Sequence, residues 1–252
     1  LTDSVITFLP RLLTAMYSKG REMGMKKRID ISTYSLEELI GPLNDVERKY
    51  APKELYVAGQ LSIPLPSPRV AVIGSRKASP EGLKAASDIS RTLAKHNVTV
   101  VSGLAEGIDT SAHTAAIEEG ECTIAVLGTP LDRVYPRKNQ QLQETIMRQY
   151  LLISQFPVGY PIQPKNFVLR NRTMALISDA SIIVEAGDNS GSLHQGWEAL
   201  RLGRPLFIWT TIIHDSSLKW PAKMLAYGAT ELTDPKQVLE VLPSGRILEV
   251  AI

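Results

Sequence analysis

The sequence predicts an α/β protein with an extended Rossmann-like fold, a doubly wound and mainly parallel sheet with helices on both faces, plus a small helical N-terminal piece. Two observations predict this fold. Short β-branched runs alternate with helical stretches from residue 69 onward, which is the order of βαβ crossovers. These runs are almost unbroken in their apolar character, as expected of strands that are covered on both faces.

The expected elements follow one another along the chain. The expected strands are Val70–Ile73, Val98–Val101, Thr123–Leu127, Leu151–Ser154, Ser181–Glu185 and Pro205–Trp209. The expected helices lie at about 80–96, 107–120, 138–149, 167–178 and 191–203, followed by two more near Lys219–Tyr227 and Asp234–Val241.

The N-terminal region has a different pattern. Apolar residues in Val5–Tyr17 recur at helical spacing, and Ser35–Ile40 opens with a capping-box pattern. Three prolines, Pro64, Pro66 and Pro68, predict a stiff linker into the first strand. The expected domains are a small helical region at 1–55, a Rossmann-like domain at 56–245 and a tail at 246–252.

The composition excludes several classes of protein. With 252 residues and 44% hydrophobic content, the chain can bury a large core. The single cysteine, Cys122, excludes a disulfide framework and a cysteine-based zinc site. No apolar stretch approaches the roughly 20 residues of a membrane span, and the N-terminus lacks a signal-peptide layout. We therefore expect a soluble, cytoplasmic protein with no membrane partner. Since the net charge is only +2, any nucleic-acid site requires a local cluster of basic residues.

Ligands of such sheets bind at the carboxyl ends of the strands, and the first of these loops is Gly74-Ser75-Arg76. The glycine permits a sharp turn, the helix that follows presents free N–H groups to a phosphate, and Arg76 adds a forked cation. A purely structural turn is the alternative. The loop is neither G-x-G-x-x-G nor a Walker loop, so we expect no dinucleotide or ATP cofactor.

The second loop, Ser102–Asp109, contains Gly103 and Gly107 and leads to His113. Asp109 and His113 are four residues apart and share a helix face. A metal site or an acid–base pair is one interpretation of this spacing. A local structural hydrogen bond is the favoured one, because no further histidine or carboxylate cluster stands nearby, and we expect neither a metal nor a catalytic residue.

The segment between Arg133 and Ser178 is locally basic, with one acid, Glu144, among seven cations. Those cations are Arg133, Arg137, Lys138, Arg148, Lys165, Arg170 and Arg172. Tyr160 and Phe167 lie among them, and cations interleaved with aromatic rings suit a single strand, whose phosphates pair with the charges while its bases stack on the rings. The alternative is a solvated basic face with two packed aromatic residues.

A further strand-end loop, Val184–Ser192, repeats the small-residue turn before a helix. Ser190, Gly191 and Ser192 could hold a phosphate at the start of that helix.

These segments, in this order, resemble the DNA-processing DprA/Smf family from about Glu54 to Leu232. The motifs that carry the resemblance are Gly74–Arg76, Ser102–His113, Val126–Asp132 with Tyr135, Pro136 and Asn139, Phe167 with Arg170–Arg172, and Glu185–Ala186 with Ser190–Ser192. The resemblance implies a recombination mediator that is not an enzyme. Such a mediator binds and protects single-stranded DNA without strong sequence preference, forms a homodimer and helps to load a RecA-type recombinase.

The resemblance also implies a set of DNA-binding residues. Arg76, Lys165, Phe167, Arg170 and Arg172 would form the DNA pocket. The full expected site for DNA and phosphate is Gly74, Ser75, Arg76, Gly103, Lys165, Phe167, Arg170, Asn171, Arg172, Ser190, Gly191 and Ser192. We expect the dimer to form through Ile212–Leu239, where Trp220, Met224 and Leu225 could offer an apolar surface.

The sequence departs from the family pattern at Gln155, at Trp209–Thr211 and at Leu193–Gln195, and no winged-helix segment follows Leu242. Two other functions stay open. One is a nucleotide phosphoribohydrolase of the related lysine-decarboxylase-like (LOG) proteins. It is disfavoured because Gln195 stands where those enzymes carry a glutamate and an amide cannot act as a general base, although Glu198 lies one turn later. The other is a nucleotide-binding sensor, which would use the phosphate-binding turns without the basic loop.

Overall fold

The computed structural model describes residues 30–243, and within them nine strands form one sheet. The order across the sheet is β1 (Ser32–Tyr34), β2 (Leu55–Gly59), β6 (Leu151–Ser154), β5 (Thr123–Leu127), β4 (Thr99–Ser102), β3 (Arg69–Gly74), β7 (Ala180–Glu185), β8 (Leu206–Trp209) and β9 (Thr230–Leu232). The strands from β6 to β9 pair in parallel, whereas β2 pairs antiparallel with both β6 and β1. The strand order reverses at β3 and β7, which is the topological switch point of a doubly wound sheet.

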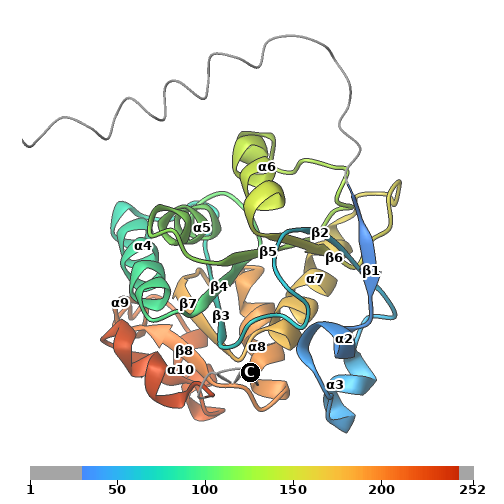
Figure 1. The fold of residues 1–252 in the computed structure, drawn as a ribbon. Coiled ribbons are helices and arrows are strands. Elements are labelled where there is room, and N and C mark those ends of the chain that lie inside the picture. The colour runs from blue at the N-terminus through green and yellow to red at the C-terminus, as the bar shows by residue number, and fades with distance from the viewer. Residues whose placement is uncertain (1–29, 244–252) are drawn as a thin grey trace, which may run out of the picture.

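Helices cover both faces of the sheet (Figure 1). One face carries α4 (Pro80–Lys95), α5 (Ile108–Glu118), α6 (Gln140–Gln149) and the 3-10 helix η2 (Pro235–Val241). The other carries α2 (Leu36–Ile40), α7 (Pro164–Ile177), α8 (Ser192–Arg201) and α10 (Trp220–Ala226). The remaining short elements are α3 (Asp45–Tyr50), η1 (Arg137–Asn139) and α9 (Thr210–Ile213). The predicted fold class is confirmed.

Burial on both faces of the sheet explains why the central strands are mainly apolar. In β3, Val70 and Val72 pack toward α4 and α5, while Ala71 and Ile73 pack toward α7 and α8. Side chains of successive strand residues point to opposite faces, so most positions of a strand covered by helices on both sides are apolar. The polar exceptions, such as Arg69 and Ser102, are hydrogen-bonded.

The described part of the N-terminal region joins this sheet. The capping box at Ser35 is confirmed, since Ser35 Oγ accepts from Glu38 N at 3.2 Å and the Glu38 carboxylate accepts from Ser35 N at 2.7 Å. Strands β1, β2 and β9 are additional to the six strands predicted. The helix expected at Val5–Tyr17 and the tail at 246–252 lie outside the described residues, and the domain division at residue 55 stays a prediction.

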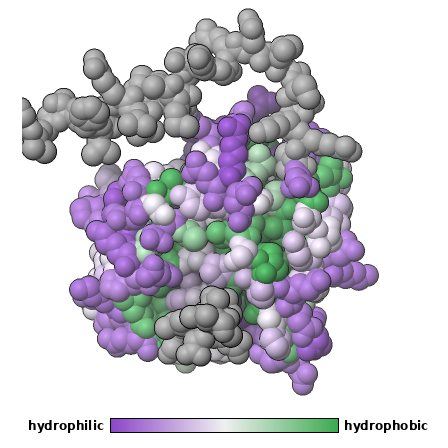
Figure 2. All heavy atoms as spheres, in the orientation of Figure 1, coloured by the Kyte–Doolittle hydropathy of each residue, from purple (hydrophilic) through white to green (hydrophobic). Residues whose placement is uncertain are grey.

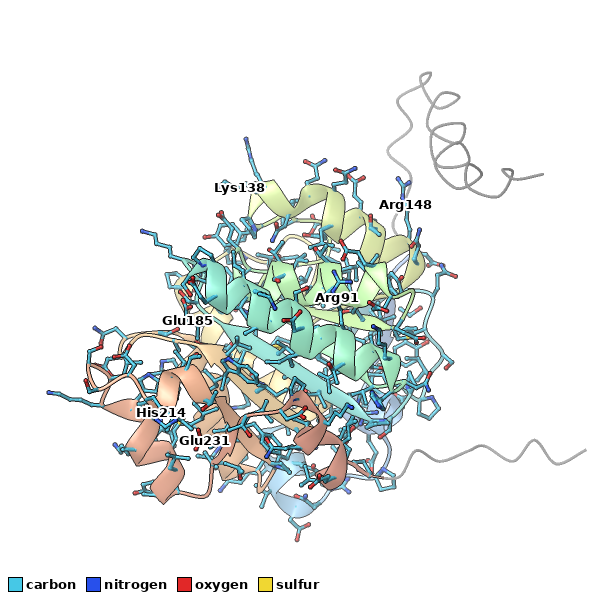
Figure 3. All side chains as sticks on the ribbon, turned by 90° about the vertical axis from the view of Figure 1, so that its left-hand side faces the viewer. Arg91, Lys138, Arg148, Glu185, His214 and Glu231 are labelled. Carbon is cyan, nitrogen blue, oxygen red and sulfur yellow. The ribbon has the colours of Figure 1, made fainter. Side chains whose placement is uncertain are left out.

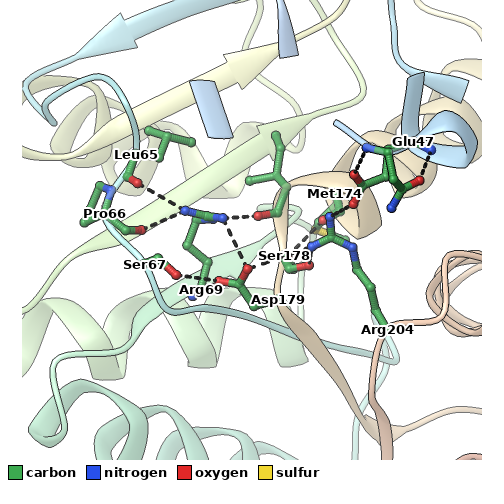
Figure 4. Close-up of polar contacts among 11 residues, drawn as sticks. Glu47, Leu65, Pro66, Ser67, Arg69, Met174, Ser178, Asp179 and Arg204 are labelled. Carbon is green, nitrogen blue, oxygen red and sulfur yellow. Dashed lines mark hydrogen bonds and ion pairs between the residues drawn. The ribbon is translucent and has the colours of Figure 1, made fainter. Parts of the chain in front are cut away.

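Buried arginines fasten this region to the amino ends of the central strands (Figure 4). Arg69 donates to the carbonyl oxygens of Ile177 (2.6 Å) and Leu65 (3.1 Å) and pairs with Asp179 at 3.3 Å. Arg204 pairs with Glu47 of α3 at 2.5 Å. Because these partners come from the N-terminal helices, the proline linker and the core, the network holds three segments in one arrangement.

The tail near Ile212–Leu239 packs differently from the expectation. Trp220 and Met224 are buried, with 6% and 0% of their surface exposed, and Trp220 Nε1 donates to the Ala186 carbonyl oxygen at 3.0 Å. The prediction that they form an exposed apolar surface is therefore wrong. Within the described residues, Tyr227 of this segment and Val241, just after it, are exposed large apolar side chains.

The surface of the view in Figure 1 is hydrophilic around its periphery, with hydrophobic residues gathered toward the middle (Figure 2). Among residues 30–243, no helix is both long enough and apolar enough to cross a membrane.

Candidate nucleic-acid interface

A cleft of about 700 Å³ lies at the carboxyl ends of the strands, at the switch point. Its walls come from the loop after β3, the loop after β7 and one face of α7. The lining includes Gly74–Lys77, Phe167, Arg170, Asn171 and Gly187–Ser192. Most of the residues that the sequence predicts for the site are thus brought together, although they are spread over more than a hundred positions of the chain.

The loop after β3 brings two exposed cations to the cleft. Ser75 N donates to the Glu185 carbonyl oxygen at 2.7 Å, and the Ser75 carbonyl oxygen accepts from Ile108 N at 3.2 Å. These bonds fix the turn between two neighbouring elements. Arg76 and Lys77 follow it, and both are exposed.

The carboxylate of Glu185, at the end of β7, bonds to the start of α4 and not to the cations of the β3 loop. It accepts from Ser79 N at 3.0 Å and from Ser79 Oγ at 2.5 Å, so it caps the start of α4. This arrangement leaves the cationic groups of the β3 loop without a carboxylate partner among the described residues.

Helix α7 lies across the ends of β4 and β5, where two glycines make room for it. A Cβ atom at Gly103 would overlap the Arg170 guanidinium, and one at Gly128 would come within 2.6 Å of the Phe167 ring. Phe167 and Arg170 are three residues apart and therefore share one face of the helix. The glycine-rich strand ends thus serve close packing against α7 as well as turning the chain.

Phe167 is half-buried at the mouth of the cleft. The Arg76 guanidinium carbon lies 5.5 Å from the centroid of its ring, and the Tyr135 ring centroid is 5.4 Å away. An aromatic ring beside an exposed arginine offers a stacking surface for a base and a cation for the adjoining phosphate.

Arg170, which the resemblance implies as a cation of the DNA pocket, lines the cleft but is buried. It is only 6% exposed, and its Nη1 donates to the Val126 carbonyl oxygen at 3.1 Å. Burial lowers the pKa of Arg170, while nearby Asp109 raises it. Its Nε has no hydrogen-bond partner. Arg170 therefore forms the floor of the cleft.

Asp109, which also lines the cleft, and His113, which is buried beneath it, do not bond to one another. Asp109 Oδ2 accepts from Ala105 N at 3.2 Å, and burial raises the pKa of Asp109. His113 Nδ1 is 2.7 Å from Thr123 Oγ1, and burial and Arg170 lower the pKa of His113 to about 3. Since Thr123 donates its proton to Val100 O, His113 carries its proton on Nδ1 and is neutral. Residues 30–243 contain no group of three or more metal-ligating side chains.

The opposite wall is the loop that opens α8. Asn171 Nδ2 donates to the Gly191 carbonyl oxygen at 2.9 Å, which ties this loop to α7. Ser190 Oγ lies 2.6 Å from Ser192 Oγ, and α8 begins without a side-chain cap. The two hydroxyls and the uncapped helix start can receive an anion. Asn171, predicted as a DNA contact, holds the loop in place.

Three predicted site residues, Gly103, Lys165 and Arg172, lie outside the cleft lining. Arg172 Nε pairs with Glu198 at 3.3 Å, and its guanidinium carbon lies 5.3 Å from the centroid of the Tyr50 ring in α3. Lys165 is exposed in the first turn of α7 but does not line the cleft.

The other cations of the basic segment are dispersed as well. Lys138 lies in η1, just before the start of α6, and Arg148 lies near the other end of α6 (Figure 3). Lys138 pairs with Glu106 at 3.0 Å. The basic segment of the sequence is therefore not one basic face. Lys77 lines the cleft and Tyr135 lies at its rim, but neither was predicted as a site residue. Lys77 directly follows the motif residue Arg76, and Tyr135 is itself one of the motif residues.

The two residues at which a phosphoribohydrolase would carry its general base, Gln195 and Glu198, are both engaged in contacts with other residues. Gln195 is fully buried, and its amide can donate to the Asn171 carbonyl oxygen and accept from Ala175 N at 3.2 Å. The Glu198 carboxylate pairs with both Arg172 and Arg201 and does not line the cleft.

Comparison with known proteins is consistent with this geometry. The model of the family described as DNA recombination-mediator protein A matches residues 36–243. Protein Smf of Escherichia coli (strain K12) is 37% identical over 195 residues, which cover 77% of this chain and 52% of that protein. DNA processing protein DprA of Streptococcus pneumoniae is 38% identical over 189 residues, covering 75% of this chain and 66% of that protein. The chain thus spans less than two thirds of the full length of these two relatives.

Two solved structures share the fold. The X-ray structure of DprA from Streptococcus pneumoniae has a TM-score of 0.71 at 32% identity, and the match covers 85% of this chain and 75% of that chain. DNA processing protein A from Helicobacter pylori, whose structure describes a single-stranded DNA binding mode, has a TM-score of 0.70 at 27% identity, with 86% of this chain and 97% of that chain covered.

Proposed function

Because this chain belongs to the DNA recombination-mediator protein A family, we propose that it binds single-stranded DNA in the switch-point cleft and acts as a recombination mediator, not as an enzyme. The observation that carries the proposal is the half-buried Phe167 ring with the exposed Arg76 guanidinium 5.5 Å from its centroid. A ring and a cation at this separation suit one nucleotide, with its base on the ring and its phosphate on the cation.

The surroundings of Phe167 support binding along a strand. Arg76 and Lys77 stand at one wall of the cleft, and the serine hydroxyls before α8 stand at the other. Positive groups on one wall and hydroxyl and N–H donors on the other suit successive phosphates of a single strand. The Helicobacter pylori protein of similar fold is one that binds single-stranded DNA.

No carboxylate among the described residues of the cleft is free to act as a general base, which supports a binding role over phosphoribohydrolase activity. Gln195 is an amide, and Glu198 is held by two arginines away from the cleft. Of the carboxylates that line the cleft, Asp109 is bonded into its own loop and Asp188 Oδ1 accepts from Lys219 N at 3.1 Å.

The partners belong to the same proposal. A mediator of this family would act with a RecA-type recombinase in the cytoplasm and would form a homodimer. With Trp220 and Met224 buried, a dimer surface would use Tyr227, which is 68% exposed, and Val241, which is 49% exposed. Sedimentation at micromolar concentration checks this, because a protein that stays a monomer of 27.7 kDa contradicts the dimer.

The test of the DNA site is titration of a fluorescent single-stranded oligonucleotide with the wild type and with Phe167→Ala. Loss of base stacking should cost about 1–3 kcal/mol of affinity and leave the salt dependence unchanged. Leu169→Ala is the matched control, because Leu169 is an exposed apolar residue of the same helix outside the cleft lining.

The same titration separates the rival functions. Binding of mono- or cyclic nucleotides without binding of the oligonucleotide would favour the nucleotide sensor. Release of free base from a nucleoside monophosphate would favour the phosphoribohydrolase. Equal loss of affinity in both variants would show that Phe167 has no special role.

A further inference from the structure

A second, smaller cavity of about 200 Å³ adjoins the cleft. Phe167, Arg76 and Arg170 line both cavities, whereas Tyr135, Pro136 and Glu106 line only the smaller one. Pockets for drug-sized ligands measure about 300–1,000 Å³, so this one has room for a single ring system.

The walls of the small cavity suit a flat, aromatic ligand. The Tyr135 and Phe167 rings are inclined to each other by 51°, with centroids 5.4 Å apart, and Tyr135 is 45% exposed. An exposed aromatic ring such as that of Tyr135 can take a further ring in an offset or edge-to-face arrangement. A base that left the large cleft past Phe167 would reach this cavity next.

The two loops that form the cavity are fixed to each other. Asn139 Nδ2 donates to the Leu104 carbonyl oxygen and to Thr110 Oγ1, both at 2.9 Å. This amide fastens the loop that carries Tyr135 to the loop that carries Glu106. Leu104 is fully buried at a φ of +59°, a left-handed conformation that a leucine rarely adopts, so the turn before Glu106 is held by its surroundings.

Among the described residues that line this cavity, Glu106 is the acidic one. Its Oε2 accepts from Lys138 Nζ at 3.0 Å, and no hydrogen bond of residues 30–243 uses its Oε1. An ionised carboxylate only accepts hydrogen bonds, whereas Arg76 and Arg170 on the other walls only donate. The cavity therefore offers acceptors on one side and donors on the other.

We propose that this cavity binds one nucleobase of the strand and that Glu106 makes it prefer a base with an exocyclic amine, cytosine over thymine. The N4 amine of cytosine donates to a carboxylate, and its ring nitrogen and O2 accept from the arginines. Thymine carries the acceptor O4 in place of that amine, and two acceptors facing each other repel. Its N3–H cannot replace the amine, because it lies between the two carbonyl oxygens of the ring. This inference rests on the proposed function, since it requires a single strand in the cleft.

The test compares the affinity of the protein for oligo-dC, oligo-dT and oligo-dU of equal length, at neutral pH, by fluorescence anisotropy. We expect oligo-dC to bind about three- to tenfold more tightly than the other two, a modest share of the discrimination that a base contact can give. Oligo-dU lacks the thymine methyl group, so it separates the effect of the amine from that of the methyl group.

Glu106→Ala should bring the three affinities together. This change also removes a negative charge and releases Lys138, which should strengthen binding of all three oligonucleotides equally. The readout is therefore the ratio of the affinity for oligo-dC to that for oligo-dT or oligo-dU, in which this electrostatic effect cancels. Glu144→Ala, an acid of α6 outside both cavities, is the matched control and should keep the wild-type ratio. Tyr135→Ala should weaken binding of all three strands.

Two outcomes would overturn the inference while leaving the proposed function intact. Equal affinities in the wild type would show that the cavity does not read the base, and an unchanged ratio in Glu106→Ala would show that Glu106 does not set the preference. Failure of the wild type to bind any single strand would overturn the proposed function and the inference with it.

Discussion

His113 lies beneath the cleft, fully buried, with a pKa of about 3 in the folded protein because burial and Arg170 disfavour its charged form. In the unfolded chain its pKa is about 6.5. As the pH falls below that value the unfolded state takes up a proton that the folded state refuses, so stability is lost at up to about 1.4 kcal/mol per pH unit. Asp109 acts in the opposite direction, because its raised pKa makes the folded state take up a proton first.

His113→Asn isolates the contribution of the histidine. The asparagine amide can replace the Nδ1 donor to Thr123 but cannot titrate. We expect the wild type to lose about 2 kcal/mol more stability than the variant between pH of about 6.5 and 5. Denaturant unfolding at both pH values measures this, and the contribution of Asp109 cancels because both proteins contain it. Parallel stability curves would contradict the burial account.

Gly103 and Gly187 provide a matched pair of glycines at the cleft. A Cβ at Gly103 would overlap the buried guanidinium of Arg170, whereas one at Gly187 would meet nothing within 4 Å. Gly103→Ala should therefore cost about 1–3 kcal/mol as an overpacked site, and Gly187→Ala should change stability by less than about 0.5 kcal/mol. Thermal or denaturant unfolding compares them. Equal effects would mean that Arg170 can move aside freely.

Helix α7 organises the site because its side chains contact a different part of the molecule on each face. Phe167 and Arg170 face the strand ends, Asn171 holds the α8 loop, and Arg172 reaches Glu198 and the Tyr50 ring. The same helix therefore joins the cleft to the N-terminal helices.

Arg172→Ala tests this division. The sequence predicts a phosphate contact for Arg172, which would make the log–log salt dependence of DNA binding shallower by about 0.7. Its position outside the cleft instead predicts an unchanged salt slope and a loss of about 1 kcal/mol of stability from the ion pair and the ring contact. Arg76→Ala should show the reverse, a shallower slope at unchanged stability. Salt titrations of both variants decide between the two roles.

The elements could be predicted from the sequence because their signals are local. Apolar runs marked the central strands, and Gly74, Gly103 and Gly191 marked the strand-end turns. The roles of the α7 arginines could not be predicted, because their partners are distant in the chain: Val126 lies 44 residues from Arg170, and Glu198 lies 26 residues from Arg172. Strands β1 and β9, of three residues each, are too short for a periodic signal.

Over the whole molecule, the 28 basic side chains are nearly balanced by 26 acidic ones, so the overall field is weak. Many basic side chains are paired, as in the contacts of Arg91 with Glu118 and Glu119. Within residues 30–243, the ion pairs do not involve Arg76, Lys77 or Lys165. Binding of a polyanion should therefore depend on a few local cations and not on net charge.

That distribution predicts a shallow salt dependence of DNA binding by this chain. Two to three phosphate contacts, from Arg76, Lys77 and Lys165, give a log–log slope of about −1.4 to −2.1 for a single strand. The double variant Arg76→Ala, Lys77→Ala should lower the slope by about 1.4 in magnitude. Lys84→Ala with Lys95→Ala removes the same charge from the exposed face of α4, where both lysines pair with acids, and should leave the slope unchanged. Equal changes in the two double variants would show that net charge, and not the cleft, attracts the strand. A wild-type slope far steeper than −2.1 would require further phosphate contacts on another surface, which a second copy of the chain could supply.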